Sequence, residues 1–197
     1  MTDRLAAVFA RIDAANADDP TRIEISGVAR PYAVFYGERM TAWLDRLMGN
    51  AEDPLRIAIR AQHIRRFDIA RDAYPMDKPG YFAWRNALKD HHATLAATIM
   101  ADIGYGEEEI ARMRSIIRKE RLKRDAQAQA LEDCACLVFL ENEFVPFAEK
   151  HADDKIVDIV AKTWAKMSEA GHTEAVDLLP ALPERLQGLV LRAVKGN

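Results

Sequence analysis

Apolar residues recur three and four positions apart along nearly the whole chain, and this helical period most constrains the fold. The alternation of apolar and polar residues that marks a half-buried strand is not convincing anywhere. The segment "IEISGV" at 23–28 is interpreted as a connector, because Gly27 and Pro31 bracket it. The sequence therefore predicts an all-α fold, a compact bundle of about seven to eight helices.

Capping and helix-breaking residues predict where the helices begin and end. Asp53 and Pro54 suit the N-cap and first turn of one helix, whereas Gly104 and Gly171 suit helix ends. The expected helices cover 3–17, 31–48, 53–72, 81–103, 107–119, 125–149, 153–171 and a last segment after Pro183. We expect one domain over 1–197, with N-terminal helices in 1–50, a core in 53–150 and C-terminal helices in 152–197.

Composition narrows the class of protein. The 197 residues are 49% hydrophobic and carry a net charge of −3, which favours a folded protein with no nucleic-acid partner. No apolar run approaches the roughly 20 residues of a membrane span, and "MTDRLAAVFARIDAAN" lacks the layout of a signal peptide. Cys134 and Cys136 are interpreted as small buried thiols in a reducing compartment, so we expect a cytoplasmic protein. The sequence leaves open a homo-oligomer.

Three polar residues interrupt the apolar faces of three different predicted helices: His63, His92 and Asp133. Because a buried polar group without a partner is costly, side chains on faces that share a core are expected to satisfy one another. Two imidazoles and a carboxylate are also ligands that hold a divalent transition metal. The alternative is a buried hydrogen-bond network in which the histidines bond backbone carbonyls and Asp133 accepts from His63 or an arginine.

Several blocks of the sequence resemble a known family. "QHIRRF", "GYFAWRNALKDHHA", "KERLKRDAQAQALEDCACLVFLE" and "KTWAKMSEAGH" occur in this order between residues 55 and 175, and they resemble the domain of unknown function 4202 family. That family has no established activity, although its members are sometimes labelled glutamyl-tRNA synthetases. "HIRR" and "KMSE" are similar to two class I synthetase signatures, but Arg65 replaces the required glycine and no α/β pattern surrounds them. We therefore discount that activity.

A weaker similarity links the chain to the HD-domain superfamily of metal-dependent phosphohydrolases. These helical proteins bind metal through a histidine, a His-Asp dipeptide and a later aspartate. The resemblance implies an HD-domain-like core in 53–150, with His63, His92 and Asp133 as metal ligands. Ala93 stands where the aspartate of the dipeptide is expected. Either the site uses fewer ligands, or it is catalytically dead, or another residue substitutes, namely His91, Glu132 or Glu120.

The HD resemblance implies hydrolysis of a small phosphorylated or nucleotide substrate. A divalent metal ion (Mn, Co, Ni, Fe, Zn or Mg) lowers the pKa of a bound water in such a site, and Glu132 or Glu120 is the candidate general base or acid. Cationic side chains are expected to hold the phosphate. The candidates are Arg66, Arg85, Lys119 and Lys123, with the two lysines on one helical face if the fifth helix extends.

Two other functions remain open at this point. One is a degenerate HD-like domain that binds a phosphate-containing ligand or a protein partner without turnover, which Ala93 favours. The other is a helical scaffold in which His63, His92 and Asp133 form only a buried network.

Overall fold

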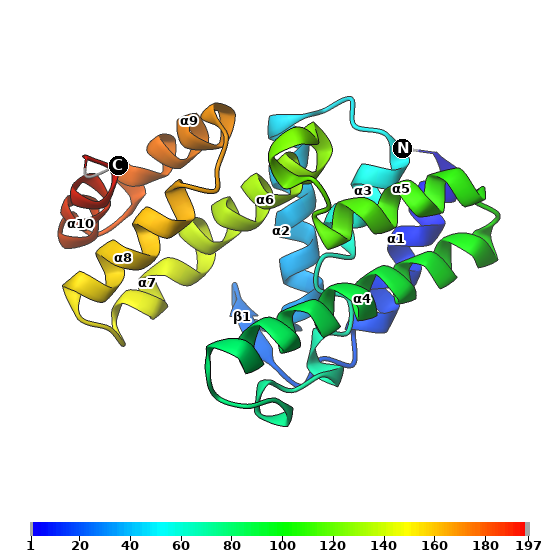
Figure 1. Ribbon diagram of the computed structural model, residues 1–197, viewed down its shortest axis with the longest axis horizontal. Helices are drawn as coiled ribbons and strands as arrows, with labels where there is room; N and C mark the ends of the chain where they lie inside the picture. Colours follow the sequence, from blue (N-terminus) through cyan, green and yellow to red (C-terminus); the bar gives the residue numbers. More distant parts are fainter. Residues whose placement is uncertain (1, 196–197) are drawn as a thin grey trace. The chain divides into compact units, whose positions relative to one another are not determined.

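The computed structural model describes residues 2–195, and it is mostly helical (Figure 1). The predicted all-α class is confirmed. Within these residues, no helix is both long enough and apolar enough to cross a membrane. The elements are α1 (Asp3–Asn16), β1 (Arg22–Ile25), β2 (Val28–Pro31), α2 (Tyr32–Leu47), α3 (Asp53–Arg60), α4 (Lys78–Ile103), α5 (Glu107–Arg118), α6 (Ala126–Val138), α7 (Phe144–Ala148), α8 (Asp153–Trp164), α9 (Glu169–Leu178) and α10 (Glu184–Lys195).

The chain forms two compact units, one that ends at Leu131 and one that begins at Glu132. In the first unit, the long helix α4 runs alongside α5 and also packs on α1 (Figure 1). Helix α3 packs against α2 and α5. The apolar faces of these helices meet in a common core, and its fully buried side chains include Val8, Ile12, Met40, Leu44, Ile59, Met100 and Ile116.

A two-stranded antiparallel hairpin precedes α2, where the sequence predicted only a connector. Ser26 and Gly27 both have positive φ, at 51° and 79°, which is typical of the two-residue turn that joins tight hairpins. The prediction missed the hairpin because its strands are only four residues long, too short for a period of two to stand out.

The third helix is much shorter than predicted. Helix α3 ends at Arg60, and two short 3₁₀ turns, Arg66–Asp68 and Arg71–Ala73, replace the rest of the expected helix. Arg65 adopts a left-handed conformation, with φ at 46°, and its N–H donates to Oδ1 of the buried Asn16 over 2.8 Å. This long-range bond holds the segment as a loop, so His63 does not lie on a helix.

The sixth predicted helix is nearly continuous. Helix α6 passes into a π-helical segment, Phe139–Glu143, and then into α7. Pro146 lacks an N–H group, and its ring clashes with a preceding carbonyl in a regular α-helix. The widened π turn directly before α7 accommodates this proline within the helical path.

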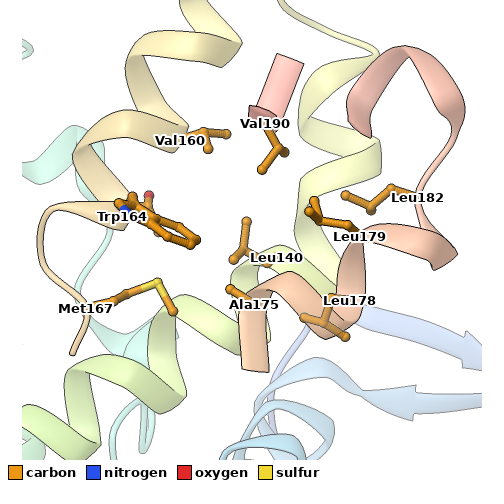
Figure 2. Close-up of a pocket in the computed structure, with 10 residues that line it drawn as sticks. Leu140, Val160, Trp164, Met167, Ala175, Leu178, Leu179, Leu182 and Val190 are labelled. Carbon is orange, nitrogen blue, oxygen red and sulfur yellow. The ribbon is translucent and has the colours of Figure 1, made fainter. Parts of the chain in front are cut away.

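The second unit has its own apolar core (Figure 2). Leu140, Val160 and Val190 point toward the same space, which Trp164 and Met167 close on one side. The space left there is only about 10 Å³, at or below what one water molecule needs, so this is a packed interior.

The sequence predicted that Gly171 ends a helix, and this prediction is wrong. Helix α8 ends at Trp164, and α9 begins at Glu169 with Ser168 as its N-cap. Gly171 lies in the first turn of α9, where a Cβ would come within 2.8 Å of Asp133 Oδ1. A glycine fits this position because a larger side chain would collide with Asp133, and not because the chain reverses its direction there.

Candidate functional site

His92 lies on the inner face of α4 and is only 3% exposed. Its Nε2 atom has no hydrogen-bond partner among the described residues, and neither does Oε1 of Gln62. Both side chains line the same small cavity of about 20 Å³. Buried polar atoms are nearly always paired, so two orphaned atoms at one cavity indicate a place for a polar ligand group or a water molecule.

Cationic side chains surround this small cavity, which we call the cationic pocket. Its lining comprises Gln62, His63, Arg66, Arg85, Leu88, Lys89, His92, Ile117 and Lys119. None of these nine described residues is acidic. Helix α4 contributes three of the polar members, because Arg85, Lys89 and His92 follow one another at helical spacing along one face.

The ends of two other elements bring the remaining cations into place. Lys119 directly follows α5 in a left-handed conformation, with φ at 57°, and Arg121 repeats this conformation two residues later. The helix therefore stops before Lys123, which is exposed and does not line the pocket. Lys119 and Lys123 were expected to share a helical face only if the fifth helix extended, and it ends at Arg118 instead. Arg66 comes from the loop after α3, where its guanidinium lies over the Trp84 ring at 4.6 Å.

Burial, reinforced by the positive environment, keeps both pocket histidines neutral. Burial, together with the charges of Arg66 and Arg85, lowers the pKa of His92 to about 3. Burial also lowers the pKa of His63 well below its ordinary value, and Arg66, His92, Lys119 and Arg85 add to this effect. The two imidazole rings are neighbours, with centroids 5.9 Å apart. Neutral imidazoles beside guanidinium and ammonium groups form a site suited to an anion.

His91 has a different role from its neighbour. Its Nε2 lies 3.2 Å from the carbonyl oxygen of Arg65 and 3.5 Å from a carboxylate oxygen of Asp68. Arg65 also forms a two-pronged ion pair with Asp68, at 2.8 and 3.1 Å. His91 thus fastens the loop that carries His63 and Arg66 to α4.

A larger cavity of about 350 Å³, which we call the aromatic pocket, adjoins the cationic pocket. Its volume falls in the range of about 300–1,000 Å³ that is typical of small-molecule sites. The two pockets share His63 and Arg66 as lining residues. The other residues that line the aromatic pocket are Asp19, Thr21, Tyr32, Ala33, Tyr36, Phe67, Ile69, Ala70 and Trp84.

Ring stacking and hydrogen bonds fix the walls of the aromatic pocket. The His63 ring stacks on Tyr36, with centroids 4.1 Å apart and planes inclined by 18°. Trp84 donates from Nε1 to the carbonyl oxygen of Ile69 over 3.0 Å. Asp19 is buried and accepts from the N–H groups of Thr21 and Ala33, each over 2.8 Å. The last of these bonds caps the first turn of α2.

Asp133, the third predicted metal ligand, belongs to the second unit. Its Oδ1 accepts from the N–H of Ser168 over 2.9 Å, and its Oδ2 accepts from the Ser168 hydroxyl over 2.6 Å. The Ser168 hydroxyl also accepts from the N–H of Gly171 over 3.2 Å, so Asp133 stabilises the start of α9. This contact explains why a buried carboxylate occurs on this helix.

The predicted catalytic glutamates do not line either pocket. Glu120 is exposed after α5, and Glu132 is a buried residue of the second unit. Nowhere in residues 2–195 do three or more His, Cys, Asp or Glu side chains form a group that could hold a metal ion. Within the first unit, two imidazoles surrounded by cations fit an anion better than a metal cation. The metal ligand set stays a prediction.

Sequence reasoning missed several lining residues. Lys89 lies four residues after Arg85 and three before His92, so the helical period of α4 could have revealed it. Gln62 is adjacent to His63 but carries no comparable signal. Tyr32 and Asp19 reach the aromatic pocket through the hairpin and the start of α2, contacts that depend on tertiary structure.

Comparison with known proteins identifies the family. The family model described as Domain of unknown function (DUF4202) matches residues 6–190, nearly the whole described chain, so the protein belongs to this family. No curated protein and no solved structure matches the chain. The comparisons support neither the resemblance to HD-domain proteins nor a synthetase label.

Proposed function

We propose that the protein binds a small phosphorylated molecule, with the phosphate seated against the cationic pocket. The observation that carries this proposal is the lining of the pocket, where Arg66, Arg85, Lys89 and Lys119 surround the orphaned Nε2 of His92. Guanidinium and ammonium groups are the usual partners of phosphate oxygens. A neutral imidazole donates a hydrogen bond to such an oxygen when the proton is on Nε2.

The balance of charge favours an anion over a bare metal cation. Each cation about 4 Å from a phosphate oxygen contributes roughly 4 kcal/mol of Coulomb attraction near a protein surface, before desolvation is subtracted. The same charges repel a divalent cation by a larger amount. Burial is the largest cause of the low pKa values of His63 and His92, and the charges of Arg66 and Arg85 lower both further.

Calorimetric titration with inorganic phosphate and with glucose 6-phosphate, at low ionic strength, tests the proposal. We expect both to bind and glucose to fail. The double variant Arg85→Gln/Lys89→Gln should lose about a hundredfold or more in affinity, because each of two charge-assisted hydrogen bonds is worth roughly 1.5–3 kcal/mol. Lys123→Gln removes an exposed cation that does not line the pocket and should bind as the wild type does. Equal loss in both variants, or no binding by the wild type, would overturn the proposal.

Metal-dependent phosphohydrolysis, with Glu120 or Glu132 as acid or base, stays a prediction. Release of phosphate from p-nitrophenyl phosphate in the presence of Mn, Co, Ni, Fe, Zn or Mg tests it. A rate that requires one of these ions, and that falls in His63→Gln and His92→Gln variants, would add turnover to binding. Binding without metal-dependent turnover favours the degenerate domain.

A further inference from the structure

In the first unit, charged side chains line mainly the cationic pocket and aromatic side chains line mainly the aromatic pocket. The cations Arg85, Lys89 and Lys119 line only the cationic pocket. Four aromatic side chains, those of Tyr32, Tyr36, Phe67 and Trp84, line only the aromatic pocket. A ligand that contacts both pockets therefore needs an anionic end and an uncharged ring.

The pockets are also close enough for one small molecule to reach both. They share His63 and Arg66, so these two side chains border both spaces. One pentose unit links base and phosphate in a nucleoside monophosphate. Sugar phosphates lack a planar ring, and inorganic phosphate leaves the aromatic pocket unfilled.

The single carboxylate of the aromatic pocket agrees with this division. Asp19 lines the aromatic pocket but not the cationic one, and it is held in place by two backbone N–H groups. A carboxylate repels a phosphate but accepts hydrogen bonds from an amino group or a ring N–H. Nucleobases carry such donors on their edges.

We propose that the phosphorylated ligand is a nucleoside monophosphate, whose base occupies the aromatic pocket between Tyr32, Phe67 and Trp84 while its phosphate meets the cationic pocket. This inference rests on the proposed phosphate site and adds the chemical class of the rest of the ligand. The shared pair, His63 and Arg66, lies beside the pentose and the ester linkage.

Calorimetric titration with AMP, GMP, CMP and UMP, compared with ribose 5-phosphate and adenosine, tests the inference. At least one nucleoside monophosphate should bind about tenfold or more tightly than ribose 5-phosphate, as expected for one base stacked on aromatic side chains. Ribose 5-phosphate should still bind. Equal binding of nucleotides and ribose 5-phosphate overturns the nucleotide assignment alone, whereas no binding by any phosphorylated probe overturns the phosphate site as well.

Variants of the aromatic pocket separate base recognition from phosphate recognition. Tyr32→Leu and Phe67→Leu each remove a ring and keep an apolar side chain, so nucleotide affinity should fall about tenfold while ribose 5-phosphate affinity is unchanged. The matched control is Phe82→Leu, because Phe82 is 54% exposed and lines neither pocket. Two variants are used so that the test still holds if one of them fails to fold. If both fold and both retain wild-type nucleotide affinity, the base does not occupy this pocket.

Discussion

His91 and Arg65 are joined by a hydrogen bond, in which the imidazole Nε2 lies 3.2 Å from the arginine carbonyl oxygen. A carbonyl oxygen only accepts, so Nε2 carries the proton in this contact. The bond connects α4 to the loop after α3 at a residue whose φ of 46° is unfavourable for a side chain larger than glycine. The adjacent histidines therefore divide two tasks, since His91 holds the loop and His92 faces the pocket.

We expect His91→Ala to lower the free energy of unfolding by about 1–2 kcal/mol, because the variant leaves a partly buried carbonyl without its partner. Urea denaturation at pH 7.5 measures this change. Thr94→Ala, an exposed substitution on the same helix, should change stability by less than about 0.5 kcal/mol. A His91→Ala variant as stable as Thr94→Ala would show that the loop does not depend on this bond.

The helical period, together with residues typical of helix starts and ends, predicted α1, α2, α4 and α5 to within a few residues. It failed over residues 61–72. There the apolar spacing continues, but the bond from Arg65 to the distant Asn16 imposes a loop. A contact over 49 positions leaves no local trace in the sequence.

The pocket residues were partly predictable for the same reason. His92 and Arg85 were each named as candidates, and because they lie seven positions apart on a regular helix, their spacing alone could have placed them on one face. Lys119 was found as a cation, yet the left-handed turn that separates it from Lys123 was not. Asp133 was expected to need a partner, and its partner is Ser168, which becomes visible only once α9 is known to begin there.

Gly171→Ala should destabilise the protein by roughly 1–3 kcal/mol. The added Cβ would come within 2.8 Å of Asp133 Oδ1 and 3.2 Å of the Met167 methyl carbon, so the packing around the start of α9 must shift. Thermal and urea denaturation report the loss.

The matched control for Gly171→Ala is Gly188→Ala. Gly188 is exposed within α10, and nothing lies within 4 Å of its added Cβ. Because alanine favours the helix, this variant should gain about 0.5–1 kcal/mol. Opposite signs for the two substitutions are required; a Gly171→Ala variant that is also stabilised would mean that the Asp133 contact is not tight in solution.

Ser26→Asn should stabilise the hairpin that precedes α2, by a few tenths of a kcal/mol. Ser26 has a φ of 51°, and asparagine tolerates this left-handed region better than serine does. Gly27→Ala, at a φ of 79°, should cost about 1 kcal/mol instead. Denaturation midpoints of both variants test the turn type, and a stabilising Gly27→Ala would contradict it.

The free energy of unfolding should decrease as the pH is lowered from about 6.5 to 5, because of His63 and His92. Both pKa values are lowered on folding, that of His92 to about 3, so the unfolded chain binds more protons in this range. Each buried histidine then removes up to about 1.4 kcal/mol per pH unit. Urea denaturation at pH 7.5, 6.5, 5.5 and 5 measures the slope, which His92→Gln should reduce. An NMR titration that places His92 near 6.5 would contradict the expectation.

Single charges of the cationic pocket should shift the pKa values of its two histidines to different extents. Burial is the largest cause of both lowered pKa values; beyond burial, Arg85 contributes to both, whereas Lys119 contributes only to that of His63. Arg85→Gln should therefore raise both pKa values and Lys119→Gln only that of His63, which an NMR titration of the imidazoles measures. Lys123→Gln lies outside the pocket and should leave both pKa values as in the wild type. If Lys123→Gln raises them as much as Arg85→Gln does, the effect comes from overall charge and not from the pocket.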